Sequence, residues 1–285
     1  MENNEKNKLE RSTLYLVGTP IGNLGDLSDR AKKVLSEVDF IAAEDTRNSM
    51  KLCSVLGIRK ELVSYFEHNK KTSGERIVAR LLSGESCALV TDAGMPAVSD
   101  PGEDIVRLCH ESGIKVSVIP GPCAAVSALA MSGLPTGRFT FEGFLSAVKG
   151  ERRAALDSLS GEMRTMIFYE APHKLRATLS DMAAAFGEDR QISLCRELTK
   201  LNEEVIRTTL GGAVRYYDEK EPRGEYVLIV EGAKEAKKED NPLLSLSVEA
   251  HVQHYIDEGM AKMDAIKAAA KDRGVSKSTL YKELL

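Results

Sequence analysis

The stretch CALVTDAGMPAVSDPG, residues 87–102, decides the fold class of this chain. Its first five residues, Cys87 to Thr91, are almost wholly apolar, which is the pattern of a strand buried on both faces of a parallel sheet. A loop rich in glycine and proline follows at once, and ligand-binding loops of open parallel sheets lie at the carboxyl ends of their strands. The stretch therefore predicts an α/β fold with a candidate binding loop.

The sequence on either side of this stretch repeats the same alternation. A helix is predicted from about Ser28, another ends near Gly57, and Gly113 closes a third. Short β-rich runs separate these helices, which is the order typical of parallel α/β architecture. The strands predicted in this half are residues 14–17, 39–43, 87–91 and 115–119.

A second set of elements begins after the turn residues GLPTG at 133–137. Its predicted strands are residues 139–144, 165–169, 191–195 and 225–230. A charged run then precedes a stretch with helical patterning. The expected organisation is a disordered tail 1–12, a first α/β domain 13–133, a second α/β domain 138–232, a charged linker 233–244 and a helical module 245–285.

The composition indicates an ordinary globular protein. The chain has 285 residues, of which 42% are hydrophobic and 29% charged, and this is enough to bury a sizeable core. No apolar run is long enough to span a bilayer, and the start MENNEKNKLERS has no apolar signal core. We therefore expect a cytoplasmic protein.

The cysteines and the net charge argue against disulfides, a metal site and a globally basic surface for nucleic acid. The five cysteines are widely spaced with no CxxC pair or nearby histidine cluster, so we expect reduced thiols and no metal. A net charge of −4 gives no global attraction to nucleic acid, so RNA binding would depend on local basic patches.

Three loops stand at predicted strand ends and are built for close backbone approach. The first lacks the GxGxxG and GxxxxGK[ST] patterns, which argues against a nicotinamide cofactor or a P-loop nucleotide. Any one loop is equally well explained as a tight turn, but three together favour a small polar ligand in a parallel α/β cleft. They are residues 18–23, 91–102 and 120–124.

The chain resembles the ribosomal small subunit methyltransferase I family of the tetrapyrrole methylase superfamily. The resemblance covers about residues 13–232 and is carried by LYLVGTPIGNLGDLSDRA, AAEDTRNS, TDAGMPAVSDPG, VIPGPCAAVSALAMSGLP, FYEAPHKL and CRELTKLNEE. The wider superfamily usually has GxGxGD in the first loop, where this chain has Asn23. That departure favours the rRNA branch and makes a transfer of tetrapyrrole-binding residues in this loop unsafe.

The resemblance implies two α/β domains of the tetrapyrrole methylase type with a cofactor cleft between them. It also implies S-adenosylmethionine as cofactor, a homodimer, and 2′-O-methylation of a decoding-site cytidine in 16S rRNA within the small ribosomal subunit. Asp92 is the natural acceptor for ribose hydroxyls or the methionyl amine, although an isolated aspartate after a strand also caps helices and turns. The other candidate cofactor residues are Thr19, Pro20, Gly22, Gly94, Met95, Ser99, Gly121, Cys123, Ala124 and Tyr169.

Transfer of a methyl group to a weakly acidic 2′-hydroxyl requires in-line positioning and benefits from a base or a nearby cation. The candidates are Glu170, His173, Arg196, Glu197, Lys200, Asp45 and Arg47, and the sequence does not choose among them. Each has a structural alternative. Arg196 and Glu197 would form an ion pair, His173 would lie at a helix start, and Asp45 would cap a helix.

RNA phosphates need cations, which are offered by residues 47–51, 149–153 and 173–176. Residues 263–282 are typical of a helix, a glycine turn and a serine-capped helix, which is helix-turn-helix spacing or a simple packing pair. Two alternatives stay open, a small-molecule tetrapyrrole methylase and a DNA-binding regulator. The first has no need of the basic tail, and the second leaves the strand-end loops unused.

Overall fold

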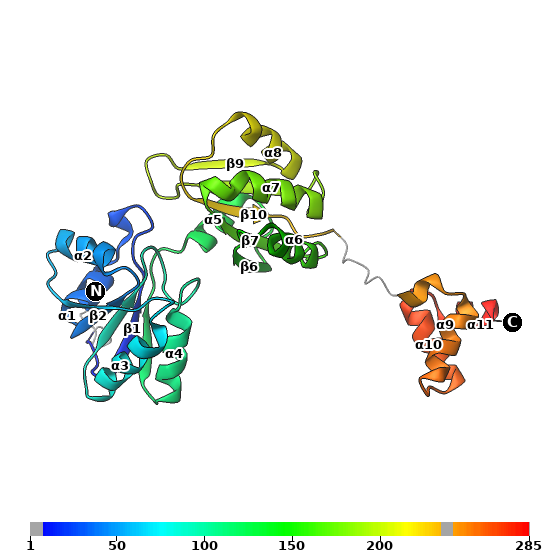
Figure 1. The fold of residues 1–285 in the computed structure, drawn as a ribbon, viewed down its shortest axis with the longest axis horizontal. Helices are drawn as coiled ribbons and strands as arrows, with labels where there is room; N and C mark the ends of the chain where they lie inside the picture. The colour runs from blue at the N-terminus through cyan, green and yellow to red at the C-terminus, as the bar shows by residue number, and fades with distance from the viewer. Residues whose placement is uncertain (1–7, 235–241, 285) are drawn as a thin grey trace. The chain divides into compact units, whose positions relative to one another are not determined.

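The computed structural model describes residues 8–234 and 242–284, which fall into two compact units that divide at Gly232. The first unit holds two five-stranded sheets, and the second holds the C-terminal helices (Figure 1). The predicted α/β class with a helical module is therefore confirmed. Residues 235–241 of the expected linker and residues 1–7 of the expected tail lie outside the described residues.

The first sheet is wholly parallel, with the strand order β3-β2-β4-β1-β5. The apolar run predicted at 87–91 forms the middle strand, and all four of its residues are buried. Carboxyl ends of parallel strands meet at one edge, so the loops after β1, β4 and β5 come together there. The strands are β1 (Thr13–Val17), β2 (Phe40–Ala43), β3 (Glu61–Ser64), β4 (Cys87–Val90) and β5 (Lys115–Ile119).

Helices cover both faces of this sheet. On α1, Ala31, Val34 and Leu35 are buried at the i, i+3, i+4 spacing that places one apolar stripe on the sheet. Ser28 caps that helix, since its hydroxyl accepts a hydrogen bond from the backbone N–H of Ala31 (3.1 Å). The helices on this face are α1 (Asp29–Glu37) and α2 (Thr46–Val55), and those on the other are α3 (Lys70–Leu82) and α4 (Gly102–Glu111). A 3-10 turn, Leu24–Asp26, precedes α1.

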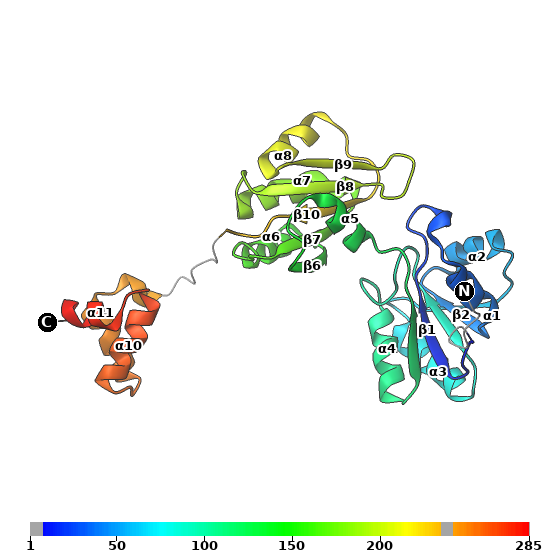
Figure 2. The ribbon, with the colours of Figure 1, turned by 180° about the vertical axis from the view of Figure 1, so that it is seen from behind.

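The second sheet is mixed, with the order β6-β7-β10-β8-β9 and only β6 and β7 parallel. Helices α6, α7 and α8 cover one face and α5 covers the other, as the views from front and back show (Figures 1 and 2). The strands are β6 (Phe139–Phe144), β7 (Thr165–Glu170), β8 (Gln191–Arg196), β9 (Glu204–Thr209) and β10 (Tyr226–Val230). The helices are α5 (Ala124–Ser132), α6 (Lys149–Ser158), α7 (Pro172–Phe186) and α8 (Leu210–Glu219).

The position of α5 corrects the predicted domain boundary. Its buried residues Ala125, Ala128 and Leu129 pack against Ile167 and Ile229 of the second sheet. The first domain, expected at 13–133, therefore ends with β5. Residues 120–123 connect it to α5, which belongs to the second domain. The turn at Gly133, with φ +75°, ends α5 but does not separate the domains.

Two further expectations need correction. Strands β3 and β9 were not predicted, because their runs, ELVS and EVIRTT, are short or interrupted by charged residues. Residues 8–12 are not a free tail. The Tyr15 hydroxyl accepts a hydrogen bond from the backbone N–H of Glu10 (2.7 Å), and the Lys115 ammonium pairs with the Glu10 carboxylate (2.7 Å).

The second unit packs α9 (Val248–Asp257), α10 (Lys262–Asp272) and α11 (Lys277–Glu283) around a small apolar core, after a 3-10 turn Pro242–Ser245. The predicted turn and cap are present: Gly274 has φ +65°, and the Ser276 hydroxyl accepts from the backbone N–H of Thr279 (3.1 Å). Buried His251 is held between Asp272 and Arg273. Throughout residues 8–234 and 242–284, no helix is both long and apolar enough to cross a membrane.

Candidate active site

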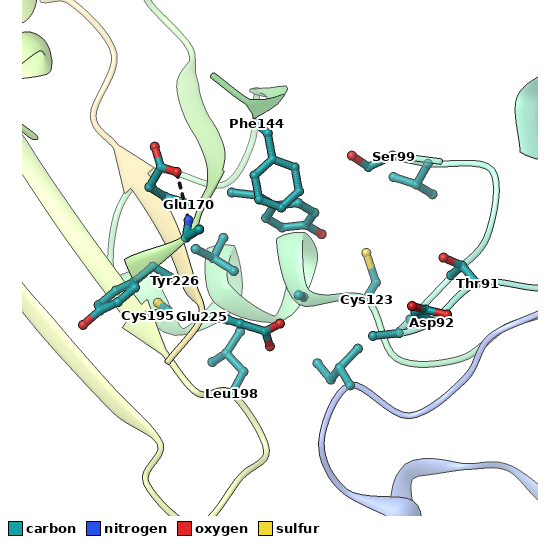
Figure 3. A pocket seen from close by; sticks show the side chains of 18 of the residues that line it. Thr91, Asp92, Ser99, Cys123, Phe144, Glu170, Cys195, Leu198, Glu225 and Tyr226 are labelled. Atoms are coloured by element: carbon teal, nitrogen blue, oxygen red, sulfur yellow. Dashed lines mark hydrogen bonds between the residues drawn. The ribbon is translucent and has the colours of Figure 1, made fainter. Parts of the chain in front are cut away.

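A cavity of about 510 Å³ lies between the two α/β domains of the first unit, a volume typical of small-molecule sites. We call it the first cavity. In Figure 3, Thr91, Asp92 and Ser99 line one side, Glu225, Leu198 and Phe144 lie across from them, and Cys123 stands between. Other residues that line it include Ile21, Glu44, Gly94, Met95, Asp100, Ala124, Tyr169, Glu170, Glu197, Lys200 and Tyr226.

The loop after β4 is fixed to the loop after β1 by a backbone bridge. The N–H of Thr19 donates to the Gly94 carbonyl (2.9 Å), and the N–H of Gly94 donates to the Thr19 carbonyl (3.1 Å). Gly94 has φ +87°, and a Cβ there would lie 3.2 Å from both Ile21 Cγ2 and the Pro122 carbonyl oxygen. Only glycine suits this position, so the backbone itself forms part of the wall.

Asp92 lies between α2 and the first cavity. Its Oδ1 accepts a hydrogen bond from the backbone N–H of Asp45 (3.2 Å), and its Oδ2 accepts from Asn48 Nδ2 (3.1 Å). The carboxylate is exposed and keeps further lone pairs for a ligand. The structural alternative is therefore partly realised, because Asp92 anchors the start of α2 while it lines the cavity.

Tyr169 lines the first cavity. Its hydroxyl accepts a hydrogen bond from the backbone N–H of Ala125 (3.2 Å), and its ring packs edge-on against Phe141 and at a tilt against Phe144. Burial raises the pKa of Tyr169 to about 12, so the phenol stays neutral at physiological pH. It offers a ligand an aromatic face and no charge.

The wall from the second domain carries one ion cluster. Lys200 Nζ donates to Glu197 Oε1 and to Glu225 Oε2, both at 2.9 Å, and the backbone N–H of Glu225 donates to Glu197 Oε1 (3.0 Å). Burial alone would lower the pKa of Lys200, but the hydrogen bonds to Glu225 and Glu197 outweigh it and raise that pKa. The hydrogen bond from Lys200 lowers the pKa of Glu197. Lys200 is therefore a fixed cation and a poor base.

The loop that carries this cluster is strained. Glu197 and Thr199 have φ values of +49° and +66°, a region that residues other than glycine seldom adopt. Strain of this kind persists where the surroundings impose it, and it concentrates at functional sites. Gly22 of the first domain permits the arrangement, since a Cβ there would lie 2.4 Å from Lys200 Cγ.

Glu170 lines the first cavity, but its carboxylate already has partners. It accepts hydrogen bonds from the Thr178 hydroxyl (2.5 Å) and the backbone N–H of Ala171 (2.8 Å), and it pairs with Lys174 Nζ (3.0 Å). The residue is 2% exposed, and in Figure 3 its carboxylate turns away from the centre of the cavity. Its geometry suits a role in fixing the start of α7 better than the role of a base.

Four of the candidate catalytic residues do not line the first cavity. Arg196 is paired with Glu204 (3.0 Å), which is the structural alternative with a different partner from the expected Glu197. His173 is exposed on the first turn of α7. Asp45 caps α2 and holds Arg47 (2.7 Å), and that hydrogen-bonded guanidinium lowers the pKa of Asp45 to about 2.

Three of the candidate cofactor residues, Thr19, Pro20 and Gly22, lie elsewhere. They line a second cavity of about 250 Å³ on the α2 side, which shares Thr91 and Asp92 with the first. Gly121 is not exposed to either, since a Cβ there would lie 2.8 Å from Gly18 Cα. Its role is to let two strand-end loops pass each other closely.

Sequence reasoning missed several residues that line the first cavity. Phe144 follows a shift in the pairing register of β6 and β7 between Phe141 and Gly143. No local sequence pattern predicts this shift. Glu225 precedes β10, which lies beside Arg196 of β8 only through antiparallel pairing. Such long-range pairing has no short-range signal. Leu198 and Tyr226 were missed for the same reason.

A cavity enclosed by strand-end loops of two α/β domains defines a small-ligand enzyme site. A sequence profile described as tetrapyrrole (corrin/porphyrin) methylases matches residues 13–214. The chain is 50% identical to ribosomal RNA small subunit methyltransferase I of Halalkalibacterium halodurans and 47% identical to that of Bacillus subtilis. These matches cover 95% and 96% of this chain and 94% of each relative.

The fold agrees with these matches. Uroporphyrin-III-C-methyltransferase from Thermus thermophilus superposes with a TM-score of 0.55 at 21% identity, over 78% of this chain and 94% of that one. The chain therefore belongs to the tetrapyrrole methylase family, in its ribosomal RNA small subunit methyltransferase I branch. Methyltransferases of this family use S-adenosylmethionine.

The residues of the first cavity fit that cofactor. Gly94 keeps a backbone cradle that a Cβ would fill, and Asp92 supplies acceptors for hydroxyl or ammonium groups. Tyr169, Phe144 and Met95 supply apolar surface for a heterocycle.

Proposed function

We propose that this protein transfers a methyl group from S-adenosylmethionine to the 2′-hydroxyl of a decoding-site cytidine in 16S rRNA. The main support is the match to relatives named ribosomal RNA small subunit methyltransferase I, at 47–50% identity over nearly the whole chain. The first cavity supports it with a donor site that fits the cofactor. The test is a map of ribose methylation on 16S rRNA from cells lacking this protein, with and without complementation.

Within this proposal the cofactor, when bound, supplies an electrophilic methyl group. The backbone around Gly94, Met95 and Cys123 holds its polar edges, and Asp92 accepts from its hydroxyl or ammonium groups. Lys200 stabilises the negative charge that develops on the acceptor oxygen, because its ammonium is fixed and partly shielded from water. Glu197 positions Lys200 and is a weak base because its pKa is lowered, so the proton released by the hydroxyl would pass to solvent water.

Cofactor binding should depend on Asp92 and not on a metal. In residues 8–234 and 242–284 no group of three or more histidine, cysteine, aspartate or glutamate side chains is placed to hold a metal ion. We expect Asp92→Ala to weaken binding by about 1 kcal/mol, the value of one exposed charged hydrogen bond. Calorimetry measures the affinity of wild type and variant with and without a chelator. Loss of wild-type binding on chelation, or an unchanged affinity in the variant, would contradict this assignment.

The C-terminal unit is proposed to add RNA affinity without taking part in chemistry. Arg273 is not free for this task, because it donates to His251 Nδ1 (3.1 Å) and to the Leu246 carbonyl. Lys277 and Lys282 are exposed and remain the candidate phosphate contacts. A chain ending at Lys234 should keep its cofactor affinity but bind small subunits more weakly, with a shallower dependence of log affinity on log salt. Unchanged methylation at every salt concentration would assign the unit to packing.

The assembly is proposed to be a cytoplasmic homodimer acting on the small ribosomal subunit, on the strength of the family membership. Light scattering at micromolar concentration under active conditions should give twice the mass of the 31.1 kDa chain. A monomeric mass with full activity would overturn this part of the proposal.

A further inference from the structure

The second cavity is built beside the first, and a transferase needs two neighbouring sites. Thr91 and Asp92 line both cavities, so the two cavities adjoin at these residues. Gly22 lines the second, and a Cβ on it would overlap the stem of Lys200, which lines the first. The side-chain stem of Lys200 therefore lies at the boundary between the two cavities.

The second cavity is lined by a hydroxyl that forms no hydrogen bond with the described residues. Ser49 of α2 is 6% exposed and lines this cavity. Among the described residues, no group forms a hydrogen bond with its side chain, while its backbone N–H donates to the Asp45 carbonyl (3.1 Å). The buried side-chain atoms without a partner in the described residues are those of Thr140 and Thr199, so the Ser49 hydroxyl is open to the cavity and is available to a ligand there.

The remaining walls are of two kinds. Pro20, Leu24 and Leu52 are apolar, and Leu24 is 42% exposed although it is a large aliphatic residue. Asn48, in contrast, is polar. Its Nδ2 donates to Asp92 Oδ2 (3.1 Å), and this hydrogen bond orients the amide. Apolar walls with an amide and a hydroxyl suit a planar ring with a polar edge. The volume of about 250 Å³ is below the range for drug-sized ligands and fits a single small unit.

We propose that the second cavity binds the target nucleoside of the RNA, with its ring against Pro20 and Leu24 and its polar groups at Ser49 and Asn48. The inference rests on the proposed function and assigns the acceptor side of that reaction. RNA is read most specifically where single-stranded bases are splayed out and hydrogen-bonded by side chains. A pocket that holds one nucleoside requires its base to be splayed out in this way. Thr19, Pro20 and Gly22 then serve the acceptor and not the cofactor.

The test uses the full chain with small ribosomal subunits from cells that lack this protein. Ser49→Ala removes the hydroxyl without adding bulk, and Leu24→Ala removes the exposed apolar wall. Each should lower kcat/KM for the subunits about three- to tenfold, the loss of one hydrogen bond or of a small apolar contact. Affinity for S-adenosylmethionine, measured by calorimetry, should stay within twofold. Ser54→Ala is the matched control, an exposed serine on the same helix outside both cavities.

The outcomes separate the two proposals. If the wild-type protein methylates no small-subunit rRNA, the proposed function fails and the acceptor site fails with it. If the wild type is active and both variants match Ser54→Ala, the proposed function stands and the acceptor site is wrong. If Ser49→Ala weakens cofactor binding by the same factor as kcat/KM, the second cavity belongs to the donor, which also overturns the inference. Circular dichroism melting confirms that each variant folds.

Discussion

Replacing Lys200 with methionine is expected to lower kcat for rRNA methylation about 10²- to 10³-fold, the usual loss when one fixed group that stabilises transition-state charge is removed. Methionine keeps an unbranched stem over Gly22 and removes only the ammonium. That ammonium is held by Glu197 and Glu225 at 2.9 Å each, so it needs no reorganisation as charge develops on the acceptor oxygen. Single-turnover rates, together with the KM for subunits and the Kd for cofactor, measure the effect.

Two controls separate charge stabilisation from simple binding. Lys200→Arg retains a cation and should recover part of kcat, whereas Lys220→Met removes an exposed lysine that lines neither cavity and should leave kcat unchanged. If Lys200→Met instead weakens cofactor affinity by the full factor while kcat at saturation is retained, Lys200 is a cofactor ligand and the assigned role is wrong.

The sequence predicts the parts of this molecule that depend on local pattern. The strand at 115–119 and the buried run at 87–90 are found where apolar content and turn residues place them. Strands β3 and β9 were not predicted because their runs, ELVS and EVIRTT, are short or interrupted by charged residues. The boundary at residue 133 failed because α5 packs on the following sheet, and a turn signal does not say which core a helix joins.

The candidate site divides in the same way. Asp92, Gly94, Met95 and Ser99 line the first cavity because strand-end loops of a parallel sheet meet at one edge. Glu170 shows the opposite case. Its position after the predicted strand 165–169 suggests a base. The hydroxyl of Thr178 and the ammonium of Lys174, both on the next helix, already satisfy its carboxylate, and only the tertiary structure reveals these contacts.

Replacing Asp181 with alanine is expected to lower the free energy of unfolding by about 3–5 kcal/mol, the usual cost of removing one partner from a buried ion pair. Asp181 is 5% exposed on α7 and pairs with Arg152 (2.7 Å), itself 6% exposed on α6, and with Arg153 (2.7 Å). Alanine would leave Arg152 charged and buried without its carboxylate. Urea denaturation of both proteins at neutral pH measures the difference.

The same pair should make this difference depend on pH. Burial alone would raise the pKa of Asp181, but hydrogen bonds from Arg153 and Arg152 outweigh it and lower that pKa below its ordinary value. A carboxylate with a lowered folded-state pKa stabilises the fold above its unfolded pKa of about 3.9 and loses that contribution as pH falls through the folded value. The difference in the free energy of unfolding between wild type and Asp181→Ala should therefore be constant near neutrality and become smaller below about pH 4.

The control is Asp157→Ala, a substitution of an exposed residue on α6. Its free energy of unfolding should differ from that of wild type by less than about 0.5 kcal/mol at every pH. If the difference for Asp181→Ala were also below about 0.5 kcal/mol, the charges of Asp181, Arg152 and Arg153 would be stabilised by solvent and not by one another.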